Sequence, residues 1–305
     1  DIIEFTYERG VKMAIYLKKE LEVASKIKDK VTFISKLNKE KPYVKVGILN
    51  LMPTLEDTER QLIEVLDTKL LQVELDFIYL DTKKVDDDKK EYYEKYYKSF
   101  REIKNEDYDG MIITGAPLEH INYHDIDYIE ELKEFFKYTK HHVRSTCFLC
   151  WASQFGLQYF YGINRYNLPE KLSGLYEHYI VKETDLTKGF NDYFFIPQSR
   201  YCSIIEGEVS KRKDLILTSK SNESGVYIVE SKDKKRVFLT GHAEYDLYTL
   251  DKEYRRDINK GLKIDPPCNY YKDNDPEKEP IYSWHATATL LYHNWLYYYV
   301  YHEVM

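Results

Sequence analysis

Cys150 lies where a short apolar segment ends and a helical pattern begins. Residues 143–149 predict a buried strand, and the apolar spacing of residues 151–161, closed by Gly162, predicts a helix. A thiol at such a turn faces unpaired backbone N–H groups and the positive end of the helix dipole, and both favour the thiolate. The position therefore predicts a cysteine nucleophile, although a buried and inert cysteine would leave the same pattern.

A C-x-x-C spacing joins Cys147 to Cys150 and raises the alternative of a redox or metal pair. Three residues apart on a strand, the two side chains would point to opposite faces. The sequence has no second C-x-x-C that would complete a zinc site. We therefore expect no metal and regard Cys150 alone as the candidate nucleophile.

His242 and Glu244 follow a second buried strand, predicted at residues 236–240. An imidazole near Cys150 would take the thiol proton and later move protons on an acceptor hydroxyl. A nearby carboxylate would hold the tautomer of the imidazole, and two residues apart in an extended segment the side chains share one side. A loop histidine beside a solvated glutamate is the alternative, because spacing alone does not show that these groups meet Cys150.

Apolar segments alternate with helical patterns through the first half of the chain. The predicted strands are residues 43–51, 73–79, 110–114 and 143–149. This alternation predicts an α/β fold of three layers, with a mostly parallel, doubly wound sheet of the flavodoxin-like kind. Ligands of such sheets bind at the carboxyl ends of the strands, so the loops at residues 50–54, 115–119 and 150–151 are expected to converge there.

Shorter strands follow residue 165 and predict an antiparallel extension of the sheet. They are expected at residues 177–181, 194–197, 215–219 and 226–230, before helices at 247–260 and 281–301. No linker or repeat divides this part, so residues 43–305 are predicted to form a single domain. Residues 1–42 are rich in lysine with apolar residues at loosely helical spacing, which predicts a helical arm on the body or on a second subunit.

The bulk composition excludes several classes of protein. The chain has 305 residues and a net charge of -7, and its Lys and Arg residues are interspersed with Asp and Glu, so we expect no nucleic-acid partner. No apolar run approaches the roughly 18 residues of a membrane span. Four cysteines at irregular spacing and the lack of a signal-peptide pattern predict a reduced, cytoplasmic setting.

Several motifs, in order from residue 43 to the C-terminus, resemble one enzyme family. They include Leu49-Asn50-Leu51-Met52-Pro53, Thr114-Gly115-Ala116-Pro117-Leu118, Cys150-Trp151-Ala152, Glu170-Lys171-Leu172-Ser173-Gly174, Ser199-Arg200-Tyr201 and Thr240-Gly241-His242. The sequence is similar to the homoserine O-acyltransferases of methionine biosynthesis, of the class I glutamine amidotransferase-like type. The first forty residues do not match the usual opening of that family.

The resemblance implies a homodimeric enzyme that transfers an acyl group from acyl-CoA to an amino-acid hydroxyl in two half-reactions. It places the thioester on Cys150, the general base on His242 and the partner carboxylate on Glu244. It needs no bound cofactor, with acetyl-CoA as a co-substrate. The backbone N–H of Trp151 is a candidate donor to the oxyanion.

Three further residues are implied to contact substrate: Lys171, Ser199 and Arg256. A guanidinium suits this role because its fork of N–H groups can hold an α-carboxylate through two hydrogen bonds. Without the resemblance, surface ion pairs and a turn cap would explain these residues equally well.

Glu119 follows Gly-Ala-Pro-Leu at the position that sorts this family by acyl donor. Glycine there accompanies succinyl donors and glutamate accompanies acetyl donors, so Glu119 predicts acetyl-CoA. A carboxylate in the acyl pocket would repel the terminal carboxylate of a succinyl group. The alternative is a glutamate that begins a surface loop.

Departures from the family pattern leave the acceptor open. Thr54 stands where a lysine usually follows Met-Pro, Gln198 replaces a common histidine, and Ala243 replaces a proline. L-Homoserine is the expected acceptor, and L-serine is the alternative. A glutaminase-like amidotransferase subunit is a further alternative, although Phe148 and Ala152 occupy the glycine positions of its usual motif. A catalytically inactive binding domain would not need Cys150, His242 and Glu244 together.

Overall fold

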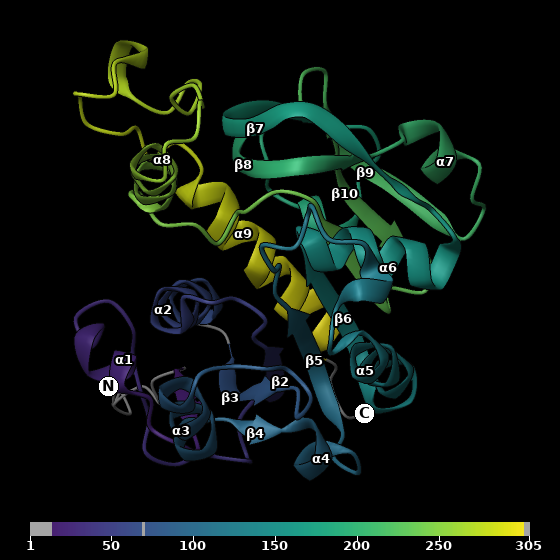
Figure 1. Cartoon of the computed structure of the whole chain (residues 1–305). Helices are drawn as coiled ribbons and strands as arrows, with labels where there is room; N and C mark the ends of the chain where they lie inside the picture. Colours follow the sequence, from purple (N-terminus) through teal and green to yellow (C-terminus); the bar gives the residue numbers. More distant parts are fainter. Residues whose placement is uncertain (1–13, 69–70, 302–305) are drawn as a thin grey trace, which may run out of the picture.

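The computed structural model describes residues 14–68 and 71–301, and one sheet runs through this part of the chain. Its strand order is β1-β3-β2-β5-β6-β11-β10-β9-β7-β8, with β4 paired to β3. The parallel strands form the lower half of the molecule in Figure 1, and the antiparallel strands form the upper half. The predicted α/β fold, with a mostly parallel sheet and an antiparallel extension, is confirmed.

The parallel half of the sheet carries the strands that the apolar runs predicted, which are β2 (Tyr43–Leu49), β3 (Gln72–Tyr79), β5 (Tyr108–Ile113), β6 (Val143–Leu149) and β11 (Arg236–Leu239). It also carries β1 (Ile15–Leu17) and β4 (Lys98–Ser99), two short strands that were not predicted. The central strands are apolar on both faces because helices cover both faces of a parallel sheet. Phe148 of β6 packs in one core and its neighbour Leu149 packs in the other.

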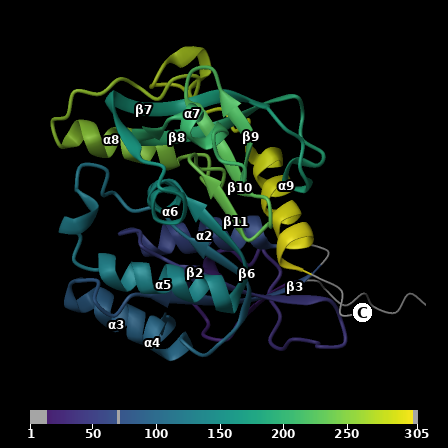
Figure 2. The ribbon, with the colours of Figure 1, turned by 90° about the vertical axis from the view of Figure 1, so that its right-hand side faces the viewer.

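Helices cover the two faces of the parallel half. The helices beyond residue 50 are α2 (Leu55–Leu66), α3 (Asp87–Tyr96), α4 (Phe100–Ile103), α5 (Ile129–His142), α6 (Trp151–Tyr161), α7 (Glu206–Ser210), α8 (Thr249–Asn259) and α9 (His285–Trp295). Helices α2 and α9 share one core, and α5 and α6 share the core of the opposite face. These layers can be followed in two perpendicular views (Figure 1, Figure 2). Among the described residues, no helix combines the length and apolar character needed to cross a bilayer.

The antiparallel extension is larger than the sequence predicted. It consists of β7 (Arg165–Ile180), β8 (Tyr193–Ile204), β9 (Leu215–Ser221) and β10 (Gly225–Ser231). Strands β7 and β8 form a long pair whose register shifts between Asn167 and Leu172. The polar stretch that begins β7 was not predicted as strand, because its pairing with β8, not an apolar pattern, makes it extended.

The described part of the N-terminal segment is not the predicted helical arm. It holds a single short helix, α1 (Glu22–Lys26), and the edge strand β1, which pairs in parallel with β3. Ile15 is fully buried and exchanges backbone hydrogen bonds with the chain at Thr32 and Ile34. The helical prediction is therefore wrong for residues 14–42, and its first 13 residues lie outside the described part.

The C-terminal helix is shorter than predicted. It begins at His285, after Trp284, and passes into a π-helical turn at Leu296–Val300. The indole N–H of Trp284 donates to the carbonyl of Tyr245 at 2.8 Å. This bond ties the start of α9 to the loop that follows β11.

Candidate active site

Cys150 occupies a strained turn between β6 and α6, as the sequence predicted. Its backbone angles are φ 47° and ψ -112°, a conformation that costs a residue with a side chain of order 1–3 kcal/mol. The N–H of Cys150 donates to the carbonyl of Leu239 at 2.7 Å, which joins the turn to the end of β11. A strained backbone conformation of this kind persists only where the surrounding structure stabilises it. Here the strained turn places the thiol of Cys150 at the carboxyl end of the sheet.

Two backbone features surround the Cys150 thiol. Trp151 is the first residue of α6, so its N–H has no carbonyl one turn earlier in the helix to bond. A Cβ built on Gly115 would lie 3.3 Å from the Cβ of Cys150, so the chain after β5 passes directly beside the thiol. The free N–H of Trp151 is therefore available to an oxyanion formed on an acyl group carried by Cys150.

His242 and Glu244 meet at the end of β11. The Nδ1 of His242 donates to Glu244 Oε1 at 2.7 Å, and the hydroxyl of Tyr292 donates to Glu244 Oε2 at 3.3 Å. The ring of His242 stacks on Tyr245 with 4.1 Å between centroids, and its backbone N–H bonds the carbonyl of Pro197 at 2.9 Å. Glu244 therefore fixes the tautomer of the ring, and the contacts with Tyr245 and Pro197 fix its orientation.

The side chain of Cys150 lies close enough to His242 to interact with its ring. Burial opposes protonation of the ring, but the negative charges of Cys150 and Glu244 raise the pKa of His242 well above its usual value. Cys150, His242 and Glu244 are 3 %, 5 % and 7 % exposed, so this line of groups is almost closed to water. The arrangement can move the thiol proton to the imidazole and return a proton to a leaving group or product.

Cys147 points into the core on the side of α2 and α9. Burial raises the pKa of its thiol well above the usual value, so Cys147 is a packed thiol with no reactive environment.

In the described part of the chain, no three His, Cys, Asp or Glu side chains lie close enough together to hold a metal ion.

A second polar cluster lies beside the first and contains the three predicted substrate residues. The ammonium of Lys171, from β7, lies 2.7 Å from Asp257 Oδ2, and the Nε of Arg256 donates to Asp257 Oδ1 at 2.9 Å. Ser199, from β8, donates to Glu253 Oε2 at 2.5 Å. Helix α8 carries both carboxylates and the guanidinium, and two strands of the antiparallel extension supply the other two side chains.

Tyr245 links the two clusters. Its ring stacks on His242 and its hydroxyl donates to Glu253 Oε1 at 2.9 Å. Arg256 leaves about half of its side chain exposed (51 %), whereas the side chain of Lys171 is 7 % exposed. The cluster therefore combines an open guanidinium with a buried carboxylate on Asp257 and a half-buried one on Glu253. Tyr245, Glu253 and Asp257 were not predicted from the sequence as site residues, although Glu253 and Asp257 flank Arg256 on one helix.

Glu119 lies at the edge of the same site. It is partly buried in the loop that passes Cys150, and burial raises the pKa of its carboxyl group. The positive charges of His242, His120 and Arg165 oppose that shift, which places Glu119 within electrostatic reach of His242. The role of Glu119 in the choice of acyl donor therefore stays a prediction, and a glutamate that begins a surface loop stays its alternative.

A buried network behind the site was not predicted at all. Arg200 is 1 % exposed, and its Nε donates to Gln198 Oε1 at 3.0 Å. The amide nitrogen of Gln198 bonds the Nε2 of His178 at 3.2 Å, and burial lowers the pKa of His178 to about 3. A Cβ on Gly241 would fall 2.4 Å from the same amide nitrogen. Gln198, at one of the positions that depart from the family pattern, therefore supports the loop that carries His242.

The α/β fold, which places Cys150, His242 and Glu244 at the carboxyl edge of its sheet, is similar to that of solved class I glutamine amidotransferases. A glutamine amidotransferase from Thermotoga maritima aligns with 84 % of this chain and 98 % of its own, with a TM-score of 0.53 and 17 % identity. Another solved structure, SMU.1228c, aligns with 82 % of this chain and 97 % of its own, with a TM-score of 0.54 and 12 % identity. At such identities the likeness concerns the fold alone.

Sequence comparison identifies the family within that class. The profile of the homoserine O-succinyltransferase family matches residues 14–305, and the chain belongs to this family. The match begins before residue 43, so the resemblance extends further toward the N-terminus than its motifs indicated.

Similar curated proteins of known name are called acetyltransferases, whereas the family profile is named for succinyl transfer. A homoserine O-acetyltransferase from Thermotoga neapolitana is 43 % identical over 260 residues, which are 85 % of this chain and 86 % of the relative. Homoserine O-acetyltransferase 1 from Ilyobacter polytropus is 39 % identical over 298 residues, which are 95 % of this chain and 98 % of the relative.

Proposed function

We propose that this protein transfers the acetyl group of acetyl-CoA to the hydroxyl of L-homoserine, in the biosynthesis of methionine. Membership in the homoserine acyltransferase family supports the reaction class, and the grouping of Cys150, His242 and Glu244, with its hydrogen bond from His242 to Glu244, supports the chemistry. That grouping is the observation that carries the mechanism. A reduced, cytoplasmic homodimer is the expected form of the enzyme.

In the first half-reaction, His242 takes the proton of the Cys150 thiol and the sulfur attacks the acetyl carbonyl carbon. The N–H of Trp151 stabilises the oxyanion of the tetrahedral intermediate. The bond from carbon to the CoA sulfur then breaks, and the departing thiolate takes the proton from His242. The products are an acetyl thioester on Cys150 and free CoA.

In the second half-reaction, His242 takes the proton of the acceptor hydroxyl as its oxygen attacks the thioester carbon. The bond from carbon to the Cys150 sulfur breaks, the sulfur recovers the proton, and the ester leaves. Glu244 keeps the ring oriented and stabilises its charged form in both halves. One imidazole therefore serves as base and acid twice in each turnover.

The polar cluster on α8 suits the amino-acid end of the acceptor. The exposed fork of Arg256 would hold the α-carboxylate, and Glu253 would accept a hydrogen bond from the α-ammonium. Lys171 holds Asp257 in place at 2.7 Å, and Ser199 holds Glu253 at 2.5 Å. Tyr245 fixes the distance between this cluster and His242.

Replacing Arg256 with alanine is expected to raise the KM for the acceptor by about 10-fold or more, since a lost hydrogen bond to a charged group costs about 1.5–3 kcal/mol. Acetylation of Cys150 in the absence of acceptor should remain near the wild-type rate. Steady-state and single-turnover kinetics measure the two effects separately. Arg255→Ala, next to it on α8, is the matched control because Arg255 bonds Asp251 and Pro276 instead. Equal losses in both half-reactions would remove Arg256 from acceptor binding.

Glu119 supports acetyl-CoA over succinyl-CoA as the donor. Two carboxylates about 4 Å apart at an effective dielectric near 20 repel by roughly 4 kcal/mol. Half of that repulsion would disfavour a succinyl group roughly thirtyfold, because about 1.4 kcal/mol corresponds to a factor of ten. A succinyl carboxylate would also have to be desolvated beside a carboxyl group that burial already penalises.

Glu119→Gly is expected to gain use of succinyl-CoA, with at least a tenfold rise in kcat/KM for that donor. The charge and the bulk that oppose the succinyl carboxylate are both removed by this change. Release of CoA from each donor at saturating homoserine measures the ratio, and Glu119→Gln separates charge from bulk. Comparable kcat/KM for both donors in the unmodified protein would overturn the donor assignment.

A panel of acceptors tests the proposed function directly. The protein is incubated with acetyl-CoA and with L-homoserine, L-serine or L-threonine, and the product masses are recorded. A preference for L-serine would replace the proposed acceptor, and glutamine hydrolysis without acyl transfer would replace the reaction class.

A further inference from the structure

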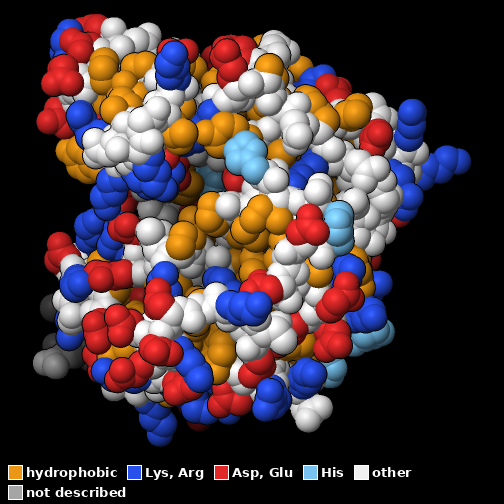
Figure 3. Space-filling view, in the orientation of Figure 1, with side chains coloured by type: hydrophobic (Ala, Val, Ile, Leu, Met, Phe, Trp, Pro, Cys, Tyr) orange, Lys and Arg blue, Asp and Glu red, His pale blue; other side chains and the backbone are white. Residues whose placement is uncertain are grey.

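A cavity of about 510 Å³ opens beside the site, where the loops after β2 and β5 face the segment between β3 and α3. One wall is apolar and includes Met52, Ala116, Pro117 and Leu118. In the space-filling view the surface is hollowed between the two halves of the sheet, and hydrophobic side chains gather beside the hollow (Figure 3). No residue assigned a catalytic or acceptor role in the proposed function lines this cavity.

One loop joins the wall of the cavity to the candidate active site. A Cβ built on Gly115 would lie 3.3 Å from the Cβ of Cys150, and the next three residues line the cavity. The cavity therefore lies beside the turn that carries Cys150, whose side chain is only 3 % exposed.

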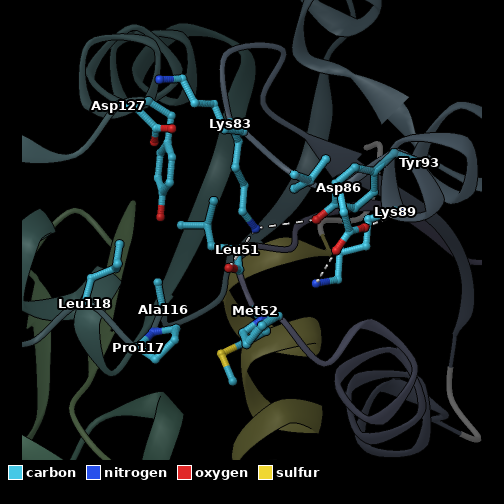
Figure 4. Close-up of a pocket in the computed structure, with 14 residues that line it drawn as sticks. Leu51, Met52, Lys83, Asp86, Lys89, Tyr93, Ala116, Pro117, Leu118 and Asp127 are labelled. Carbon is cyan, nitrogen blue, oxygen red and sulfur yellow. Dashed lines mark hydrogen bonds and ion pairs between the residues drawn. The ribbon is translucent and has the colours of Figure 1, made fainter.

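The opposite wall of the cavity is cationic. The ammonium of Lys83 donates to the carbonyl of Leu51 at 2.8 Å and to the hydroxyl of Tyr93 at 3.4 Å (Figure 4). Lys84 and Lys89 line the same wall, and Lys89 lies 3.5 Å from Asp86. Neither Lys83 nor Lys84 forms an ion pair with a carboxylate anywhere in residues 14–68 and 71–301.

The ammonium group of Lys83 is largely buried and has no carboxylate within ion-pair distance among the described residues. Burial, with the charge of Lys89, lowers its pKa to about 8, and Asp127 opposes this shift only in part. Its two partners are a carbonyl and a hydroxyl, which satisfy hydrogen bonds but leave the charge unbalanced. An anionic group in the cavity would supply the missing charge.

We propose that this cavity binds the pantetheine arm of the acyl-CoA donor, with the phosphate groups of CoA against Lys83 and Lys84. The inference rests on the proposed function, because it takes acyl-CoA as the donor. Pantetheine is an extended chain of methylenes and amides, which suits an apolar wall with a few polar groups, and phosphates suit ammonium groups. The loop at Gly115 then leads the thioester end to Cys150.

The test compares acetyl-CoA with S-acetylpantetheine, a donor that keeps the arm and lacks the phosphates. Lys84→Ala is expected to raise the KM for acetyl-CoA about 10-fold with kcat nearly unchanged, because one charged contact is lost. Its effect with S-acetylpantetheine should be several times smaller. Lys83→Met should show the same split, and Lys211→Ala, an exposed lysine at the end of α7, is the control.

Calorimetric titration with free CoA separates a failure of this inference from a failure of the proposed function. A wild-type protein that binds CoA more tightly than Lys84→Ala by about 10-fold supports the site, whatever the acceptor is. Equal losses with both donors, or unchanged CoA binding in Lys84→Ala and Lys83→Met, would overturn it. Absence of turnover with acetyl-CoA in the wild-type protein would instead overturn the proposed function, and the titration would still decide the site.

Discussion

Cys150→Ala is expected to abolish turnover and to leave no acetyl group on the protein after incubation with acetyl-CoA. The physical reason is that no other described thiol combines a strained turn, a neighbouring imidazole and a position at the start of a helix. Intact-mass and peptide mass spectrometry without acceptor should find one acetyl group, on the peptide of Cys150. The turnover rate of Cys150→Ala should lie several orders of magnitude below that of the wild-type protein, because the covalent intermediate no longer forms.

Two other cysteines provide controls for this experiment. Cys147→Ala removes a buried thiol of the core, and Cys268→Ala removes a partly exposed one. Both variants should acquire the acetyl group as the wild-type protein does. An acetyl group that persists in Cys150→Ala would assign the nucleophile to another residue and contradict the proposed mechanism.

His242→Ala is expected to lower kcat by about 10²- to 10⁴-fold, the range of a general base, while the protein remains folded. The ring lies between Cys150 and Glu244, so its loss removes the acceptor of the thiol proton and the donor to the leaving group. Glu244→Gln should cost less, because an amide oxygen can still accept the bond from Nδ1 while the charge is lost. Steady-state kinetics with acetyl-CoA and homoserine measure both variants.

Alkylation of Cys150 by iodoacetamide gives a second measurement that needs no substrate. The negative charges around His242 raise its pKa, so a charged ring beside the sulfur would stabilise the negative charge that develops there during alkylation. His242→Ala should therefore slow alkylation at neutral pH, whereas His124→Ala, on an exposed loop, should not. Near-normal turnover and alkylation in His242→Ala would remove this residue from the mechanism.

The relation between this family and the amidotransferases lies in the fold. In this chain the candidate cysteine site lies where the strands of a doubly wound sheet end, which is where such sheets bind ligands. The side chains that we propose for acceptor binding lie on α8, β7 and β8, outside the parallel core. The proposal therefore places chemistry and acceptor choice on different elements of the fold.

The sequence by itself determined the parallel half of the fold and the catalytic candidates. The strand before Cys150, the turn at Cys150 and the helix after it follow from a local apolar pattern that is readable within twenty residues. The spacing of His242 and Glu244 is equally local, because two residues in an extended segment share a side. These elements appear in the structure within a few residues of their predicted bounds.

Only the tertiary structure decided the rest. The residues of β1 have an apolar spacing that predicted a helix. They are extended instead, because they pair with β3 at the edge of the sheet. Lys171, Ser199 and the acidic residues of α8 lie far apart in sequence, and the long β7–β8 pair brings them together. The cavity of Lys83 is likewise made by four segments that no local pattern relates. Local propensities predict elements, whereas contacts between distant residues depend on how the whole chain packs.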